Sequence, residues 1–299
     1  MTQTDYSNPG TYNFESVVTE FQSTSGRMVP VRITFPINCP HAPLIVFSHG
    51  YLGSEDGYRS LTKNWASYGF VVIQPRHADS LTGKSPEERR RAASFTDPTA
   101  FGDPRQRVDE VRECVDHAAG WARQYGFSAD TARLVVAGHS YGGLTTELAA
   151  GAKPRRLQVQ PERRALGYMV LSGQGIGRMF SEESFSSLTK PMLVVSGDND
   201  TLGKIGVLPD QNPISRKDPF LLSPGGNKWL LWLKDAHHDL GGMNDTRYYK
   251  SGPHDEEMLG ALKGTTTAFL LSLLKSDTAA QQAMRRGLNL PSQHQLISR

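Results

Sequence analysis

The feature that most constrains this 299-residue chain is its alternation of short apolar runs with longer segments of helical periodicity. Short apolar runs are typical of buried strands, and crossover helices join such strands in parallel sheets. The runs lie at residues 27–35, 44–48, 70–74, 133–137, 165–172, 191–196 and 228–234. They predict an α/β chain with seven core strands in one doubly wound, mostly parallel sheet flanked by helices.

The chain shows no linker that would separate two domains. We therefore expect an N-terminal extension or edge strand over residues 1–26 and one domain over residues 27–275. The polar residues 276–299 are expected to form a loosely held tail. Two helix starts carry capping signals, which are Ser85 with Glu88 and Asp103 with its following proline.

One strand leads directly into the sequence Gly138-His139-Ser140-Tyr141-Gly142, which matches the pattern G-x-S-x-G. Its context makes the match specific, because an apolar run precedes it and a helical segment follows it. Glycines are needed where the chain turns sharply, since side chains two residues either side of the serine would collide. The pattern predicts Ser140 as a nucleophile held in a strained turn. The alternative is a glycine-rich turn with a capping serine.

The loop after residues 44–48 is expected to supply an oxyanion donor. In this arrangement one backbone N–H follows the nucleophile and a second comes from the loop after an earlier strand. We expect these donors to be the N–H groups of Tyr141 and Tyr51. His49 precedes the turn, and we interpret it as a buried histidine that orders the loop rather than as a base.

Candidate acids follow the strand at residues 191–196. Asp198 and Asp200 both qualify, and the tight turn at Gly197 favours Asp200. Asp198 is then expected to accept hydrogen bonds from the backbone of the turn.

Candidate bases follow the strand at residues 228–234, where His237 and His238 are adjacent. We favour His238, which would accept the serine proton through one ring nitrogen and donate to the aspartate through the other. No third ligand lies at a spacing typical of a metal site, so we expect no metal and no cofactor.

Composition excludes several function classes. The chain has 33 Lys and Arg against 30 Asp and Glu, which is too mixed a charge for a nucleic-acid-binding protein. No apolar run approaches the about 18 residues of a membrane span. Residues 1–10 do not resemble a secretory signal and the two cysteines are expected to be free thiols, so we predict a cytoplasmic location. A mature exported form stays an open alternative, and oligomeric state is not indicated.

Three segments bear on access to the site. Residues 173–190 have room for about one short helix, which predicts an open or shallow site with little or no lid. The charge run at residues 87–91 reads as a solvated helix face, with an arginine that binds an acidic substrate group as the alternative. Phe95 and Phe101 flank this segment as a possible pocket wall, and residues 201–227 are expected to cover part of the site.

Taken in order, the motifs resemble the dienelactone-hydrolase-like and platelet-activating-factor-acetylhydrolase-like branch of the α/β-hydrolases over residues 29–274. These motifs occupy residues 47–53, 69–72, 138–143, 197–200 and 238–242. The resemblance implies Ser140 as nucleophile, Asp200 as acid, His238 as base and an oxyanion N–H from Tyr51. Dienelactone hydrolases proper use a cysteine nucleophile, and the serine here favours ordinary carboxylic esters.

We therefore expect a serine hydrolase that cleaves a small-molecule carboxylic ester through an acyl-enzyme intermediate. An amidase or an acyltransferase would use the same triad. A non-catalytic binding module is the remaining alternative, and the complete set of serine, aspartate and histidine argues against it.

Overall fold

All seven apolar runs form strands of one sheet in the computed structural model, which describes residues 4–93, 102–202, 212–244, 253–288 and 290–299. Nine strands lie in the order β1-β2-β4-β3-β5-β6-β7-β8-β9. The strands are β1 (Phe14–Gln22), β2 (Met28–Pro36), β3 (Ala42–Ser48), β4 (Val71–Pro75), β5 (Ala129–His139), β6 (Gly167–Leu171), β7 (Met192–Asn199), β8 (Lys228–His237) and β9 (Gln295–Ser298). β4, β3 and β5 to β8 run parallel, while β1, β2 and β9 pair antiparallel with their neighbours. The predicted mostly parallel sheet is thus confirmed.

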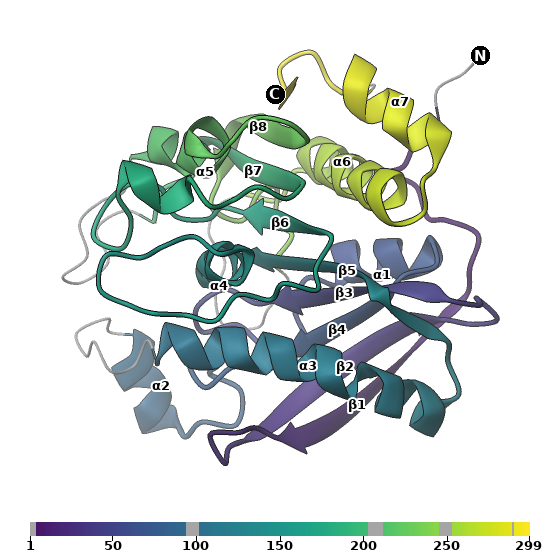
Figure 1. The fold of residues 1–299 in the computed structure, drawn as a ribbon, viewed down its shortest axis with the longest axis vertical. Helices are drawn as coiled ribbons and strands as arrows, with labels where there is room; N and C mark the ends of the chain where they lie inside the picture. The colour runs from purple at the N-terminus through teal and green to yellow at the C-terminus, as the bar shows by residue number, and fades with distance from the viewer. Residues whose placement is uncertain (1–3, 94–101, 203–211, 245–252, 289) are drawn as a thin grey trace.

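Helices cover both faces of this sheet (Figure 1). They are α1 (Arg59–Ser67), α2 (Pro86–Ala93), α3 (Pro104–Tyr125), α4 (Tyr141–Ala150), α5 (Asp218–Leu222), α6 (Glu256–Leu274) and α7 (Thr278–Arg286), with 3-10 helices η2 (Glu182–Phe185) and η3 (Pro213–Lys217). Successive side chains of a strand point to opposite faces. In β3, Leu44 and Val46 pack with α3 and α4, whereas Ile45 and Phe47 pack with α1 and α6.

The predicted helix starts are formed by the expected capping contacts. The Ser85 N–H donates to a Glu88 carboxylate oxygen at 2.7 Å, and the Glu88 N–H donates to Ser85 Oγ at 3.3 Å. Asp103 accepts from the Arg105 N–H at 2.9 Å and begins α3. These contacts fix where α2 and α3 begin, because they satisfy first-turn N–H groups that have no partner within the helix.

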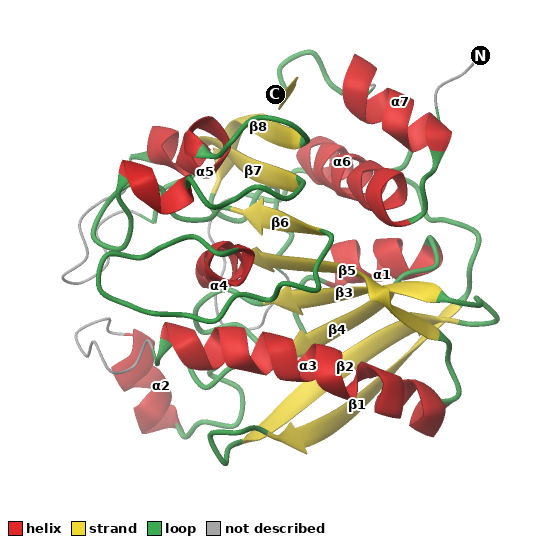
Figure 2. Ribbon diagram, viewed as in Figure 1, coloured by secondary structure: helices red, strands yellow, loops and turns green. Residues whose placement is uncertain are grey.

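The parallel strands bring distant loops to one place. The carboxyl ends of β3, β5, β7 and β8 meet at the same edge of the sheet, which is where ligands bind in open α/β sheets. Figure 2 shows loops that leave this edge of the sheet near α4. The loops after these four strands carry the expected oxyanion donor, nucleophile, acid and base, respectively.

The prediction that residues 276–299 form a loosely held tail is wrong. Ala280, Ala283 and Met284 of α7 are buried against the core. β9 pairs antiparallel with β8, placing Ile297 opposite Leu230. The segment is mostly polar, and only three residues of α7 form its apolar stripe. The four residues of β9 cover the edge of β8, which would otherwise lack a partner.

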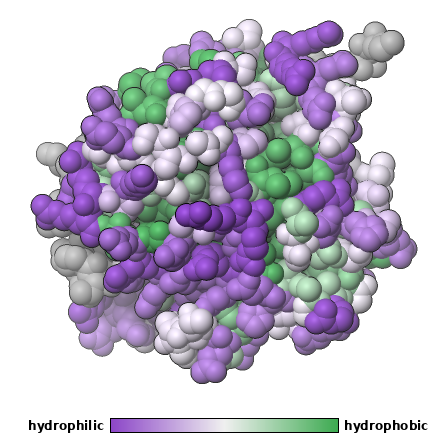
Figure 3. Space-filling view, viewed as in Figure 1, coloured by the Kyte–Doolittle hydropathy of each residue, from purple (hydrophilic) through white to green (hydrophobic). Residues whose placement is uncertain are grey.

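The predicted surface features agree with the structure where it describes them. Residues 173–190 contain the short helix η2, as expected, and the charged side chains of α2 are mostly exposed. Phe95 and Phe101 lie outside the described residues. On the face shown in Figure 3, apolar side chains gather in separate patches amid a mainly hydrophilic surface. Among the helices described, none is long and apolar enough to cross a membrane.

Candidate active site

Ser140 lies in the turn between β5 and α4 with φ 58° and ψ −114°. This is a strained conformation for a residue with a side chain, and such strain is concentrated at functional sites. The turn is held by a hydrogen bond from the Ser140 N–H to the carbonyl of Leu171 in β6, at 2.9 Å. The sequence therefore folds into the expected elbow, with the serine between strand and helix.

The glycines of the elbow are required by close backbone contacts. A Cβ at Gly138 would lie 2.2 Å from the carbonyl oxygen of Gly142, and a Cβ at Gly142 would lie 1.9 Å from that of Ser48. At Gly143 a Cβ would lie 2.9 Å from the Leu171 carbonyl oxygen. The first two collisions cannot be relieved by turning a side chain, which confirms why the sequence has glycine there.

Three side chains from separate loops form one line of hydrogen bonds. His238 Nε2 lies 2.7 Å from Ser140 Oγ, and His238 Nδ1 lies 2.6 Å from Asp200 Oδ1. All three residues are buried. A carboxylate can only accept, so Nδ1 carries the proton and Nε2 directs its lone pair at the serine hydroxyl. This arrangement can remove the hydroxyl proton as the oxygen attacks an electrophile.

The two alternatives left by the sequence lie outside this line. His237 is exposed at the end of β8. The Asp198 carboxylate accepts from the Trp232 indole N–H at 2.7 Å and from the Asp235 backbone N–H at 3.2 Å. Both donors belong to the neighbouring strand β8, whereas the sequence predicted donors from the backbone of the turn that carries Asp198.

Asp200 is fully buried and has a second set of partners that the sequence did not reveal. Its Oδ2 accepts from Ser196 Oγ at 2.6 Å, and Arg216 Nε lies 3.1 Å from its Oδ1. Burial alone would raise the pKa of Asp200, but the Arg216 guanidinium and His238 hold it well below its ordinary value. The carboxylate therefore stays ionised beside His238.

Arg216 belongs to η3, within the segment 201–227 that was expected to cover part of the site; residues 203–211 of that segment are outside the described part. Its Nε also donates to the Asp200 carbonyl oxygen at 2.8 Å, and its Nη1 donates to the Ser172 carbonyl oxygen at 2.7 Å. No periodicity or motif in the sequence marks this arginine as buried.

A second line of hydrogen bonds joins the loops behind the serine. The Gly50 N–H donates to Tyr58 Oη at 3.0 Å, and Tyr58 Oη lies 3.0 Å from His139 Nδ1. His139 Nε2 lies 2.8 Å from the carbonyl oxygen of His238. Because that carbonyl only accepts, His139 donates from Nε2 and accepts the Tyr58 proton at Nδ1.

This direction requires a neutral His139. Burial and the nearby His238 lower the pKa of His139 to about 3. The position was visible in the sequence as the residue before Ser140, but its partners were not.

The loop expected to hold the oxyanion lies against the nucleophile. A Cβ at Gly50 would lie 3.3 Å from the Cβ of Ser140. Tyr141 is the first residue of α4, so its N–H lies in the helix turn that has no intrahelical acceptor. A helix N-terminus stabilises negative charge, which suits the developing oxyanion.

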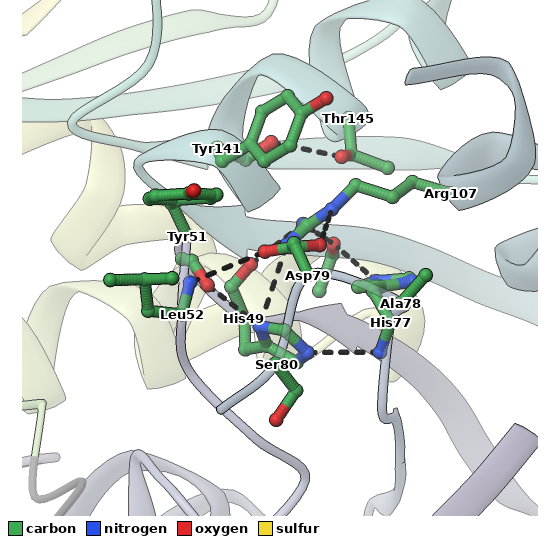
Figure 4. Close-up of polar contacts among 12 residues, drawn as sticks. His49, Tyr51, Leu52, His77, Ala78, Asp79, Ser80, Arg107, Tyr141 and Thr145 are labelled. Atoms are coloured by element: carbon green, nitrogen blue, oxygen red, sulfur yellow. Dashed lines mark hydrogen bonds and ion pairs between the residues drawn. The ribbon is translucent and has the colours of Figure 1, made fainter. Parts of the chain in front are cut away.

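His49 is buried and orders this loop, as expected. Its Nδ1 lies 2.7 Å from the Gly50 carbonyl oxygen, and its Nε2 accepts the His77 backbone N–H at 3.0 Å. Both contacts are satisfied by one neutral tautomer, with the proton on Nδ1. Burial and Arg107 lower the pKa of His49 well below its ordinary value. Figure 4 shows Arg107 between Asp79 and the Tyr141 ring.

No group of three or more His, Cys, Asp or Glu side chains suited to a metal ion occurs among the residues that the structure describes. Cys39 and Cys114 are both buried free thiols, as predicted.

Comparison with known proteins places this chain in a family. The family model described as Chlorophyllase matches residues 2–159, which is more than half of the chain. Cutinase 1 of Thermobifida cellulosilytica is 25% identical over 232 residues, covering 71% of this chain and 74% of that protein. Cutinase of Thermobifida fusca (strain YX) is also 25% identical over 232 residues, covering 71% of this chain and 64% of that protein.

These matches agree with the α/β-hydrolase superfamily that the motifs indicate. They do not confirm the dienelactone-hydrolase-like or platelet-activating-factor-acetylhydrolase-like branch. Sheet order, elbow geometry and the family match agree with one another. The chain belongs to the Chlorophyllase family, within the α/β-hydrolase superfamily of serine esterases.

Proposed function

We propose that this chain hydrolyses small-molecule carboxylic esters through an acyl-enzyme on Ser140, with His238 as general base and Asp200 as its partner. The observation that carries the proposal is the continuous contact from Ser140 Oγ to His238 Nε2 at 2.7 Å and from His238 Nδ1 to Asp200 at 2.6 Å. The family supports ester rather than amide substrates.

Each step follows from this geometry. Ser140 Oγ attacks the ester carbonyl while its proton passes to His238 Nε2. Asp200, kept ionised by Arg216, stabilises the imidazolium and holds the ring in place. The tetrahedral intermediate places its oxyanion near the N–H groups of Tyr51 and Tyr141. His238 then gives its proton to the leaving alcohol, and water repeats the sequence to release the acid.

The test pairs each proposed residue with the neighbour that the sequence alone did not separate from it. Turnover of a panel of p-nitrophenyl esters of increasing acyl length is measured for Ser140→Ala, His238→Ala and Asp200→Asn. His237→Ala and Asp198→Asn are the controls. Loss of the serine is expected to lower kcat by a factor on the order of 10⁶, with native circular dichroism retained.

Outcomes that oppose the proposal are specific. Substantial turnover by Ser140→Ala, or a larger loss in His237→Ala than in His238→Ala, would remove the assignment. Covalent labelling by a fluorophosphonate, located on Ser140 by mass spectrometry, distinguishes an enzyme from a binding module. Matched anilides and added alcohol acceptors test the amidase and acyltransferase alternatives.

A further inference from the structure

A buried ion pair lies beneath the loop that carries Tyr51, and the mechanism above does not use it. Arg107 of α3 donates to both carboxylate oxygens of Asp79, from Nε at 2.9 Å and from Nη2 at 2.8 Å. Both side chains are almost completely buried. Burial alone would raise the pKa of Asp79, yet the Arg107 guanidinium bound to it holds that pKa below its ordinary value, so the pair is ionic.

The pair holds the loop on both sides of Tyr51. Arg107 Nη1 donates to the His49 carbonyl oxygen at 2.8 Å, two residues before Tyr51. Asp79 Oδ2 accepts the backbone N–H of Leu52 at 3.2 Å, one residue after it. The peptide that presents the Tyr51 N–H is therefore fixed at both ends by one salt bridge (Figure 4).

The same guanidinium also contacts the residue that presents the other donor. The Tyr141 ring lies over Arg107, with the guanidinium carbon 4.2 Å from the ring centroid. The Tyr51 ring meets the Tyr141 ring edge-on, with centroids 6.3 Å apart. One cation thus touches segments that follow two different strands, β3 and β5.

A buried pair of this kind costs desolvation energy, and apolar packing of the same volume is often as stable. Stability alone therefore gives little reason for the pair. A loop without secondary-structure partners, however, needs a donor for its carbonyl and an acceptor for its N–H. A planar guanidinium paired with a carboxylate supplies both in fixed directions.

We propose that Arg107 and Asp79 are positioning residues of the oxyanion hole, which set the Tyr51 N–H relative to the Tyr141 N–H. This inference rests on the proposed function. The oxyanion contacts form only in the transition state, so misplacing a donor lowers kcat and leaves KM nearly unchanged. Removing one oxyanion donor costs about 10²–10³ in kcat, and displacing one is expected to cost about 10–100-fold.

The experiment measures kcat and KM for Arg107→Lys, Arg107→Met, Asp79→Asn and Tyr141→Leu. The last variant keeps its backbone N–H and removes only the stacked ring, so it tests the contact without opening the buried pair. Arg112→Lys, at a partly exposed arginine on the same helix, is the matched control and is expected to retain wild-type kcat. Near-ultraviolet circular dichroism and active-site titration give the folded, competent fraction of each variant.

A second readout separates positioning from a merely structural role. Phenylboronic acid forms a tetrahedral adduct on the serine and places an oxygen in the oxyanion hole. Its inhibition constant is expected to rise in proportion to the loss of kcat/KM across the variants, because both report the same donors. A structural role would lower the melting temperature while the folded fraction keeps its kcat and its boronate affinity.

That last result would overturn the inference, as would losses confined to KM. Failure of the proposed function is recognised separately. In that case Ser140→Ala, with Arg107 and Asp79 unchanged, would retain turnover. Should the Arg107 variants not fold, Tyr141→Leu decides the matter: unchanged kcat and boronate affinity would overturn the inference.

Discussion

Replacement of Arg216 by methionine tests how the acid of the site is kept ionised in a dry environment. Arg216 and Asp200 are both fully buried, and the arginine donates to the carbonyl oxygens of Asp200, Ser172 and Gly173. Methionine fills much of the volume but leaves the Asp200 charge without its cation. Breaking a buried pair by removing one partner costs about 3–5 kcal/mol. This is a large part of a total stability of about 5–15 kcal/mol.

The assay is urea unfolding at pH 7 followed by tryptophan fluorescence. The double variant Asp200→Asn/Arg216→Met is the control, because it removes the carboxylate that Arg216→Met leaves unpaired. In the Asp200→Asn background, Arg216→Met is expected to lower the free energy of unfolding by about 1–3 kcal/mol less than it does in the wild type. The reasoning would be refuted if Arg216→Met lowered the free energy of unfolding by less than about 1 kcal/mol in the wild-type background. It would also be refuted if the decrease were the same with and without Asp200→Asn.

The same substitution is expected to shift the pH dependence of both stability and kcat/KM in one direction. The folded-state pKa of Asp200 lies below its ordinary value, so its stabilising contribution is present above the unfolded pKa and is lost as pH falls through the folded pKa. Without Arg216 the folded pKa rises. The stability loss and the acid limb of kcat/KM should therefore both move to higher pH, since protonated Asp200 no longer accepts from His238. Asp198→Asn should leave this limb in place.

Two further substitutions test contacts behind the serine, and a third, on the surface of α3, is their control. Tyr58→Phe removes the hydroxyl between the Gly50 N–H and His139. It should lower the free energy of unfolding in urea by about 1–3 kcal/mol, because the buried Gly50 N–H loses its acceptor. An unchanged midpoint would show that the Gly50 N–H does not depend on this hydroxyl. Gly142→Ala should abolish turnover and lower stability severely, because its Cβ would lie 1.9 Å from a carbonyl oxygen. At Gly120, on the exposed side of α3, an added Cβ meets nothing within 4 Å, so Gly120→Ala should stabilise the fold by about 1 kcal/mol. Thermal unfolding measures both alanine variants. Equal shifts in their melting temperatures would show that the elbow tolerates a side chain.

The sequence by itself determined the sheet and the elbow. Short apolar segments predicted seven of the nine strands that the structure describes. Burial on both faces leaves a continuous apolar signal in the central strands, and the strand near the edge at residues 27–35 was marked by alternation. The pattern around Ser140 predicted the strained turn, because only glycine tolerates the backbone contacts on either side. The preference for Asp200 came from the tight turn at Gly197, and that for His238 from its place after the last core strand and from the family resemblance; their catalytic roles stay a proposal.

Only the tertiary structure decided which polar residues are buried behind the site. Arg107 occupies the apolar face of its helix, a signal present in the sequence, but nothing there showed Asp79 as its partner 28 positions away. Arg216 had no local signal at all. Whether a charge can be buried depends on donors and acceptors brought by other segments, so it is settled only when the sheet assembles. The same holds for residues 276–299, whose narrow apolar stripe gains meaning from the core and the β8 edge that it covers.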